Sequence, residues 1–228
     1  MKNKIIVALD VSDFQQAEGL VKALSSEISV FKIGMELFTR QGPRVVEMVH
    51  AHKAKVFLDL KFHDIPNTVF GAVKSALELG VFMCNVHALG GREMMCKALE
   101  AKQQARSQAL LVAVTVLTSM NSDMLREVGV EVSLPQEVER LALLTKQAGL
   151  SGVVCSGHEL LKIQEVCGKD FVTVVPGIRP SWVEAHDQKR VLTPREAFQM
   201  GAHYIVIGRP ITHASSPLEA AKRIIQEL

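Results

Sequence analysis

The chain has 228 residues, 48% of them hydrophobic, which is enough for a sizeable core in one large domain or two small ones. Its 26 basic and 24 acidic residues are spread along the sequence, with a net charge of +2 and no basic block that could follow a phosphate backbone, so nucleic acid is not expected as a partner. No stretch reaches the roughly 18 apolar residues of a membrane span, and the apolar run before Asp10 is too short for a signal peptide, so we expect a cytoplasmic protein without a membrane partner.

Eight short runs rich in β-branched residues alternate with segments of amphipathic, helical character. The runs are IIVAL from residue 5, VFKI from 30, VFLDL from 56, FMCNV from 82, LLVAVTV from 110, GVVC from 152, FVTVV from 171 and YIVI from 204. Capping patterns open several of the intervening segments, at Ser12, Ser156, Thr193 and Ser216. Apolar strands joined through helices favour a parallel sheet. The pattern predicts an α/β fold, a single (β/α)8 TIM barrel domain over residues 1–228.

A doubly wound open sheet is the alternative fold. A dinucleotide site in such a sheet carries a glycine fingerprint after the first strand, and the DVSDF segment there lacks it. No linker or low-complexity tract divides the sequence. The closed barrel is therefore favoured.

The predicted strands end in polar residues. In chain order these are Asp10, Lys32, Asp59 with Lys61, His87, Thr115 to Thr118, Pro176 with Gly177 and Arg179, and Gly208 with Arg209. A (β/α)8 barrel gathers the C-terminal ends of its strands at one rim, where active sites lie. We therefore expect these scattered residues to meet at one mouth.

Residues 57–68, FLDLKFHDIPNT, place three charged side chains, Asp59, Lys61 and Asp64, at the end of an apolar strand. Alternation along the strand turns Asp59 and Lys61 to the same face. The flanking carboxylates favour a protonated lysine, which donates a proton but is a poor nucleophile, and this argues against a Schiff-base aldolase. Lys32 also needs carboxylates, and Asp10 and Asp59 are available on neighbouring strands. We predict a charged network of all five side chains; the alternative is a purely structural set of ion pairs.

Two further segments have features of phosphate and base recognition. Gly208 and Arg209 offer backbone N–H groups and a guanidinium where barrels of this kind often bind phosphate. The polar loop PGIRPSWVEAHDQKRVLTP after the seventh strand has the length of a functional lid, and Gln188 is its candidate phosphate contact. Thr118 and Ser119, after the fifth strand, can hydrogen-bond a planar heterocycle.

Neither a metal site nor a disulfide is expected. The eight histidines form no ligand set, since His50 and His52 lie two apart on a predicted helix and face different ways. The four cysteines, at positions 84, 96, 155 and 167, form no CxxC pair, so we expect them to be reduced and structural.

The motifs LDLKFHDIPNT, FKIGMELF, AVTVLTS, PGIRP, DQKR and IGRP together resemble the orotidine 5′-phosphate decarboxylase family of the bacterial type. The likeness runs from Asp10 to Arg209, although DxKxxD alone is shared with a wider superfamily of phosphosugar barrels. The resemblance implies decarboxylation of orotidine 5′-monophosphate to uridine 5′-monophosphate, the last step of pyrimidine nucleotide synthesis, with no cofactor and no metal.

The resemblance also implies a role for each matching residue. Lys61 is the implied proton donor to C6 of the pyrimidine, and Asp59 lies near the departing carboxylate. The implied substrate-binding residues are Asp10 and Lys32 at the ribose, Thr118 and Ser119 at the base, Gln188, Gly208 and Arg209 at the phosphate, and Pro176 and Arg179 in the PGIRP segment. The implied catalytic set is Lys32, Asp59, Lys61 and Asp64. Asp64 and Thr68 reach into a partner subunit's site, so a homodimer is implied.

Two other functions stay open. A superfamily relative acting on sugar phosphates, a decarboxylase or an aldolase, resembles this chain but is expected to depend on a metal and to carry an acidic residue in place of Lys32. A non-catalytic nucleotide-binding barrel, in which the charged residues only satisfy one another, is the second. Chelation and turnover of the nucleotide discriminate among these functions.

Overall fold

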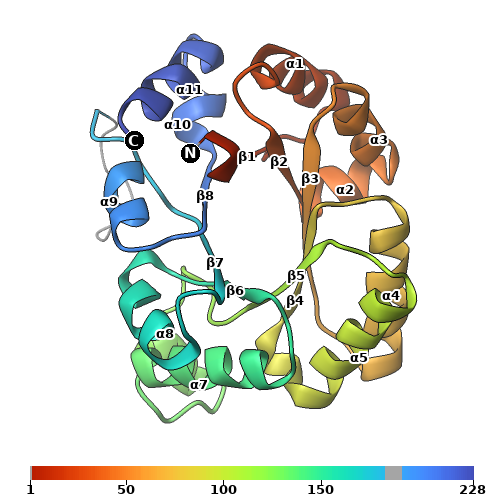
Figure 1. Ribbon diagram of the computed structural model, residues 1–228, viewed down its shortest axis with the longest axis vertical. Coiled ribbons are helices and arrows are strands. Elements are labelled where there is room, and N and C mark those ends of the chain that lie inside the picture. Colours follow the sequence, from red (N-terminus) through yellow and green to blue (C-terminus); the bar gives the residue numbers. More distant parts are fainter. Residues whose placement is uncertain (1, 183–191) are drawn as a thin grey trace.

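The computed structural model describes residues 2–182 and 192–228 and contains a closed barrel of parallel strands (Figure 1). The strands, in chain order and in spatial order, are β1 (Ile5–Ala8), β2 (Val30–Gly34), β3 (Lys55–Phe62), β4 (Met83–His87), β5 (Leu110–Val114), β6 (Gly152–Val154), β7 (Val172–Val175) and β8 (Tyr204–Ile207). Pairing of β1 with β8 closes the barrel. The eight predicted strands and the (β/α)8 fold are confirmed, and the open-sheet alternative is wrong.

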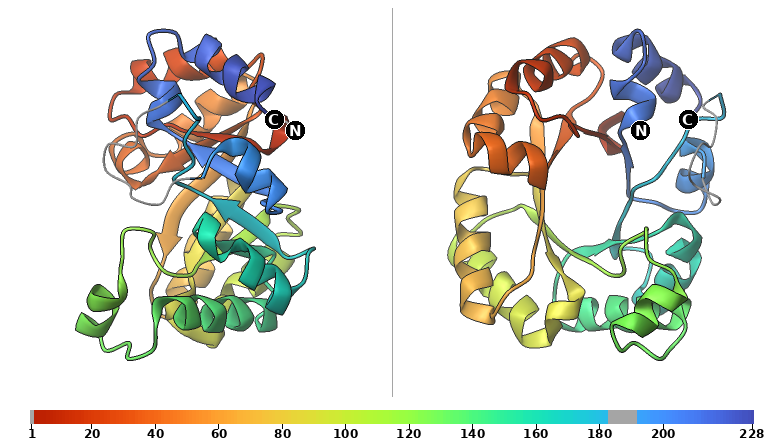
Figure 2. Two further views of the ribbon diagram at one scale, coloured as in Figure 1. Left: turned by 90° about the vertical axis from the view of Figure 1, so that its left-hand side faces the viewer. Right: turned by 180° about the vertical axis from the view of Figure 1, so that it is seen from behind.

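Helices surround the barrel, as Figure 2 shows from two further directions. They are α1 (Phe14–Leu24), α2 (Met35–Gln41), α3 (Arg44–Ala51), α4 (Pro66–Glu78), α5 (Gly91–Gln104), α6 (Ser122–Glu127), α7 (Leu134–Gln147), α8 (Leu160–Cys167), α9 (Pro194–Gln199), α10 (Arg209–Thr212) and α11 (Pro217–Gln226), with 3-10 turns η1 (Lys2–Lys4), η2 (Ala88–Gly90) and η3 (Gly157–Glu159). None of these helices is long and apolar enough to cross a membrane.

Most of the predicted helix caps hold. Thr193 and Ser156 each form a capping box with an acidic residue three positions later, opening α9 and η3. Ser216 occupies the cap position of α11 without a side-chain hydrogen bond. The prediction of Ser12 as the cap of α1 is wrong, because the carboxylate of Asp13 accepts the Gln16 N–H at 2.8 Å and the helix begins one residue later.

Buried apolar residues form two layers, one between the strands and the helices and one inside the barrel. The inner layer, which we call the barrel-interior cluster, consists of Ile6, Ala8, Val30, Phe57, Met83, Val112, Val174 and Val206. Side chains alternate along a strand, so the residue two positions later also faces inward. Above Val30, Phe57 and Met83 these positions hold Lys32, Asp59 and Asn85, so the polar site lies directly on the apolar interior.

The four cysteines are free thiols, as predicted. Three of them are buried and only Cys96 is exposed. Burial raises the pKa of the Cys84 thiol to about 12, which keeps it protonated and unreactive.

Candidate active site

A cavity of about 270 Å³ opens at the C-terminal ends of the strands, on top of the barrel-interior cluster. Its lining residues come from every strand except β4 or from the loop that follows each strand: Ala8, Asp10, Lys32, Phe57, Asp59, Lys61, Val114, Val116, Leu117, Thr118, Val154, Pro176, Gly177, Val206 and Gly208. Most of the polar residues predicted at the strand ends therefore do meet at one mouth of the barrel.

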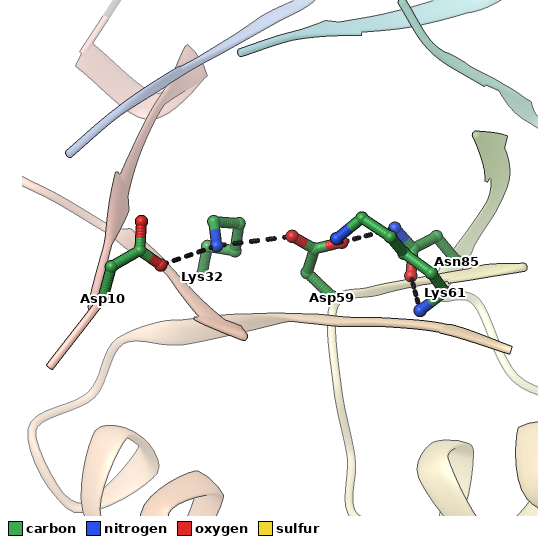
Figure 3. Close-up of polar contacts among 5 residues, drawn as sticks. All are labelled: Asp10, Lys32, Asp59, Lys61 and Asn85. Atoms are coloured by element: carbon green, nitrogen blue, oxygen red, sulfur yellow. Dashed lines mark hydrogen bonds and ion pairs between the residues drawn. The ribbon is translucent and has the colours of Figure 1, made fainter. Parts of the chain in front are cut away.

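Four charged side chains form an alternating row along one wall of the cavity (Figure 3). Lys32 Nζ lies 2.9 Å from Asp10 Oδ1 and 3.3 Å from Asp59 Oδ2, and Lys61 Nζ lies 2.7 Å from Asp59 Oδ1. The Asp10 side chain is 62% exposed at the open end of the row, whereas those of Lys32 and Asp59 are each 12% exposed. Two lysines and two aspartates from β2, β3 and the turn after β1 therefore hold one another in place.

The inner members of this row stay charged because each has ionic partners. Burial acts to lower the pKa of Lys32, but the carboxylates of Asp59 and Asp10 outweigh it and the net pKa is raised. Burial acts to raise the pKa of Asp59, but Lys32 and Lys61 outweigh it, helped by hydrogen bonds from Lys61 and Asn85, and the net pKa is lowered. Gly34 leaves room for the row, since a Cβ there would lie 3.3 Å from Lys32 Nζ.

The end of β3 departs from a regular strand between Leu58 and Phe62, where its register against β4 shifts. Lys61 adopts φ of +51°, a left-handed conformation that residues with a side chain rarely occupy. Asp59 and Lys61 lie together as predicted. Their placement depends on the irregular backbone at Lys61 as well as on the alternation of side chains along the strand.

Asn85 is a site residue that sequence reasoning missed. It is completely buried in β4, its Nδ2 donates to Asp59 Oδ1 at 2.7 Å, and its Oδ1 accepts from the Lys61 backbone N–H at 2.8 Å. The available signal was an amide at the inward-facing position two residues after Met83, in an otherwise apolar run.

Asp64 and Thr68 lie outside the cavity lining and are exposed. The Asp64 carboxylate accepts the Ile65 N–H at 2.7 Å, at the start of α4. Within one chain the charged row therefore has four members instead of the predicted five. The assignment of Asp64 and Thr68 to a partner's site stays a prediction.

The residues expected at the base and the phosphate are only partly gathered in the cavity. Thr118, Pro176 and Gly208 line it, whereas Ser119, Arg179 and Arg209 do not. Arg209 is the first residue of α10, directly after Gly208, and the Arg179 N–H donates to the Leu192 carbonyl at 3.0 Å. Gln188 lies outside the described residues.

Two histidines near Lys61, His63 and His87, stack on each other. Neither of them lines the cavity. The rings of His63 and His87 are 5.3 Å apart between centroids, and His87 Nδ1 accepts the Leu89 N–H at 3.4 Å. Burial first, and then the charges of His63 and Lys61, lower the pKa of His87 to about 4. His87 is therefore neutral at physiological pH. Among the described residues no group of three or more His, Cys, Asp or Glu side chains is placed to hold a metal ion.

Comparisons with known proteins agree with this geometry. The family model described as "Orotidine 5'-phosphate decarboxylase / HUMPS family" matches residues 3–224. Orotidine 5′-phosphate decarboxylases of Syntrophotalea carbinolica and Moorella thermoacetica are each 50% identical to the chain, covering 100% of it and 95% and 92% of those proteins. The crystal structure of orotidine 5′-phosphate decarboxylase from Lactobacillus acidophilus superposes with a TM-score of 0.87 at 38% identity, covering 99% of this chain and 98% of that one. The chain therefore belongs to the orotidine 5′-phosphate decarboxylase / HUMPS family.

Proposed function

We propose that this protein decarboxylates orotidine 5′-monophosphate to uridine 5′-monophosphate and CO2, as the last step of pyrimidine nucleotide synthesis, with no metal or cofactor. The observation that carries the proposal is the row of Lys32, Asp59 and Lys61 in the cavity. A divalent cation bound by Asp59 would stand between two ammonium groups, which repel it. The row therefore suits a metal-free reaction better than the metal-dependent chemistry of the sugar-phosphate relatives.

Lys61 is the proposed proton donor. Breaking the bond between C6 and the carboxylate releases CO2 and leaves the electron pair on C6 of the pyrimidine. The Lys61 ammonium stabilises that charge and transfers a proton from Nζ to C6, after which the neutral amine takes a proton from water. Asp59, 2.7 Å from Lys61 Nζ, aims the ammonium at the reacting carbon.

The remaining wall of the cavity is proposed to hold the nucleotide. Asp10 and Lys32 are the proposed contacts of the ribose hydroxyls, and Thr118 and Ser119 those of the base. The proposed phosphate site consists of Gly208 and Arg209 at the start of α10, with Gln188, Pro176 and Arg179 from the connection after β7. Binding energy from the phosphate, remote from C6, can then be used to drive the substrate against the charged row.

We further propose a homodimer in the cytoplasm, in which Asp64 and Thr68 complete the active site of the partner subunit. Both residues are exposed at the start of α4 and outside their own cavity. Ile65 between them is 68% exposed, so a partner subunit packed on the start of α4 would also bury an apolar side chain.

The direct test follows the ultraviolet absorbance of orotidine 5′-monophosphate mixed with purified protein in excess chelator. Rapid conversion to uridine 5′-monophosphate in the presence of chelator is the expected result. Activity that disappears on chelation, or turnover only of a hexulose or ketogulonate phosphate, would favour the metal-dependent relatives. Tight binding of uridine 5′-monophosphate without turnover of the substrate would instead indicate a nucleotide-binding barrel.

A further inference from the structure

Asn85 occupies a place in the barrel where a polar side chain needs an explanation. It lies in β4 between Val86 and Cys84, is 0% exposed, and stands above Met83 of the barrel-interior cluster. A buried amide that makes no hydrogen bonds destabilises the folded state, so its partners determine what it does. Both of those partners belong to the charged row or to its backbone.

The two hydrogen bonds of Asn85 connect a carboxylate with a main-chain amide of the same strand. Asp59 Oδ1 receives Asn85 Nδ2 at 2.7 Å and Lys61 Nζ, also at 2.7 Å. Asn85 Oδ1 receives the Lys61 N–H at 2.8 Å. A carboxylate cannot donate and an N–H cannot accept, so these partners leave a single orientation for the amide.

This link acts where β3 is irregular. The register of β3 against β4 shifts between Leu58 and Phe62, so the Lys61 N–H has a side-chain acceptor, Asn85 Oδ1, where a regular ladder offers a carbonyl. Lys61 has φ of +51°, which is disfavoured for any residue with a Cβ and persists only when the surroundings hold it. The Asn85 carbonyl supplies that restraint and thereby sets the direction in which the Lys61 side chain leaves the strand.

We infer that Asn85 is a positioning residue for the proton transfer: it holds the bulged backbone at Lys61 and the carboxylate of Asp59 in the one arrangement that aims the Lys61 ammonium at the reacting carbon. The inference rests on the proposed function for its kinetic consequence. One acceptor and one donor are required at this position, which an amide provides. A leucine of similar size provides neither, and an ionised aspartate provides only the acceptor.

The experiment compares Asn85→Leu and Asn85→Asp with the unmodified protein, using kcat and KM for orotidine 5′-monophosphate from pH 5 to pH 9. Thr145→Val is the matched control, because Thr145 is equally buried and bonds the Leu141 carbonyl in α7, away from the cavity. Thermal unfolding of each protein shows whether it is folded at the assay temperature.

For Asn85→Leu we expect kcat to fall on the order of 10²-fold, because the Lys61 ammonium is no longer held toward the reacting carbon. KM should change by less than roughly threefold, because the ribose and phosphate contacts remain. Thr145→Val should keep the unmodified kcat. For Asn85→Asp, the ratio of its kcat to that of the unmodified protein should be lowest at pH 9 and rise as the pH falls. Protonation of the new carboxyl restores a donor to Asp59, and this recovery would not accompany a merely structural defect.

The inference is overturned if folded Asn85→Leu retains kcat within roughly threefold of the unmodified value, which is far from the loss expected of a misplaced donor. It is equally overturned if the ratio of the Asn85→Asp kcat to the unmodified kcat does not change with pH. If Asn85→Leu fails to fold, this pH dependence alone tests the inference. If the unmodified protein does not decarboxylate the nucleotide, the proposed function fails separately. Crystal structures then test the positioning: an unchanged Lys61 φ and Lys61–Asp59 distance in Asn85→Leu would contradict it, and a displaced Lys61 would support it.

Discussion

The two halves of the barrel contribute different chemistry to one cavity. The turn after β1 and strands β2 and β3 line it with Asp10, Lys32, Asp59 and Lys61, which are joined by ion pairs, and Asn85 of β4 hydrogen-bonds to this row from outside the lining. The last four strands and their loops line the cavity with Val114, Val116, Leu117, Thr118, Val154, Pro176, Gly177, Val206 and Gly208, among which Thr118 alone has a polar side chain. One half therefore supplies charge at fixed positions, and the other supplies an apolar surface and backbone groups.

This division has a physical reason. A buried ion is stable only when partners surround it, so charges in a cavity wall occur together or not at all. Under the proposed function the neutral half faces the flat heterocycle, while Gly208 and Arg209, just after β8, contact the phosphate. If the account is right, changes in the charged half should act on the chemical step and changes in the neutral half on binding.

Removal of the Lys61 ammonium should have the largest effect. Lys61→Ala is expected to lower kcat by up to about 10⁴-fold, since the variant loses both the proton donor and the charge that stabilises the carbanion. Steady-state turnover of orotidine 5′-monophosphate measures the loss. Lys97→Ala is the control, because Lys97 pairs with Glu100 on α5 and does not line the cavity. Turnover by Lys61→Ala within tenfold of the unmodified protein would remove Lys61 from the mechanism.

Neutralising Asp59 should lower both activity and stability. Asp59→Asn leaves two lysines without their shared carboxylate, and we expect the free energy of unfolding at pH 7 to fall by about 3 kcal/mol. The pKa of Asp59 is lowered in the fold from its usual 3.8, so its stabilisation is present above that value and is lost as the pH falls through the folded pKa.

Urea unfolding at pH 7 and at pH 3 checks this sign. The difference between the unmodified protein and Asp59→Asn should be larger at pH 7 than at pH 3. Asp123→Asn is the control, because Asp123 is an exposed carboxylate paired with Arg126, and it should change stability by less than about 1 kcal/mol. A difference that grows toward pH 3 would show that the folded protein does not favour the ionised carboxylate.

Arg209→Ala should separate binding from chemistry. Loss of a charge-assisted hydrogen bond to phosphate is expected to lower kcat/KM for orotidine 5′-monophosphate by about 10- to 100-fold. The nucleoside orotidine, which lacks the phosphate, should be turned over far more slowly by the unmodified protein and equally slowly by the variant. An equal loss on both substrates would place Arg209 outside the phosphate site.

Val154→Ala should have the smallest effect. The substitution shortens a side chain in the apolar wall, and we expect KM to rise by roughly tenfold or less while kcat stays near its unmodified value. Kinetics on orotidine 5′-monophosphate measure both constants. A fall in kcat as large as that expected for Lys61→Ala would mean that the two halves do not divide binding and chemistry as described.

Much of the fold and the site could be predicted from the sequence because each depends on a repeated local pattern. The strands follow from short β-branched runs, and the meeting of Lys32 with Asp10 and Asp59 follows from the fact that their strands are neighbours in a barrel. The cap at Asp13 was missed because Ser12 and Asp13 are both good caps and only the backbone decides between them.

Two other features depend on tertiary geometry that no local pattern encodes. The left-handed backbone at Lys61 lies where β3 shifts its register against β4, and a lysine at this position does not indicate it in the sequence. Asn85 could have been suspected as a polar residue in an apolar run, but its partners lie 24 and 26 residues away. The proposed role of Asp64 involves a second chain, so neither the sequence nor the structure of a single chain can test it.

The most direct test of the account asks whether Lys61 moves the proton at C6. If it does, the same step must run backward, so uridine 5′-monophosphate in D2O should slowly exchange its C6 hydrogen for deuterium when the unmodified protein is present. Proton NMR of the nucleotide follows this exchange without any decarboxylation. We predict exchange with the unmodified protein and none above background with Lys61→Ala. Exchange at the same rate in both proteins would contradict the central claim.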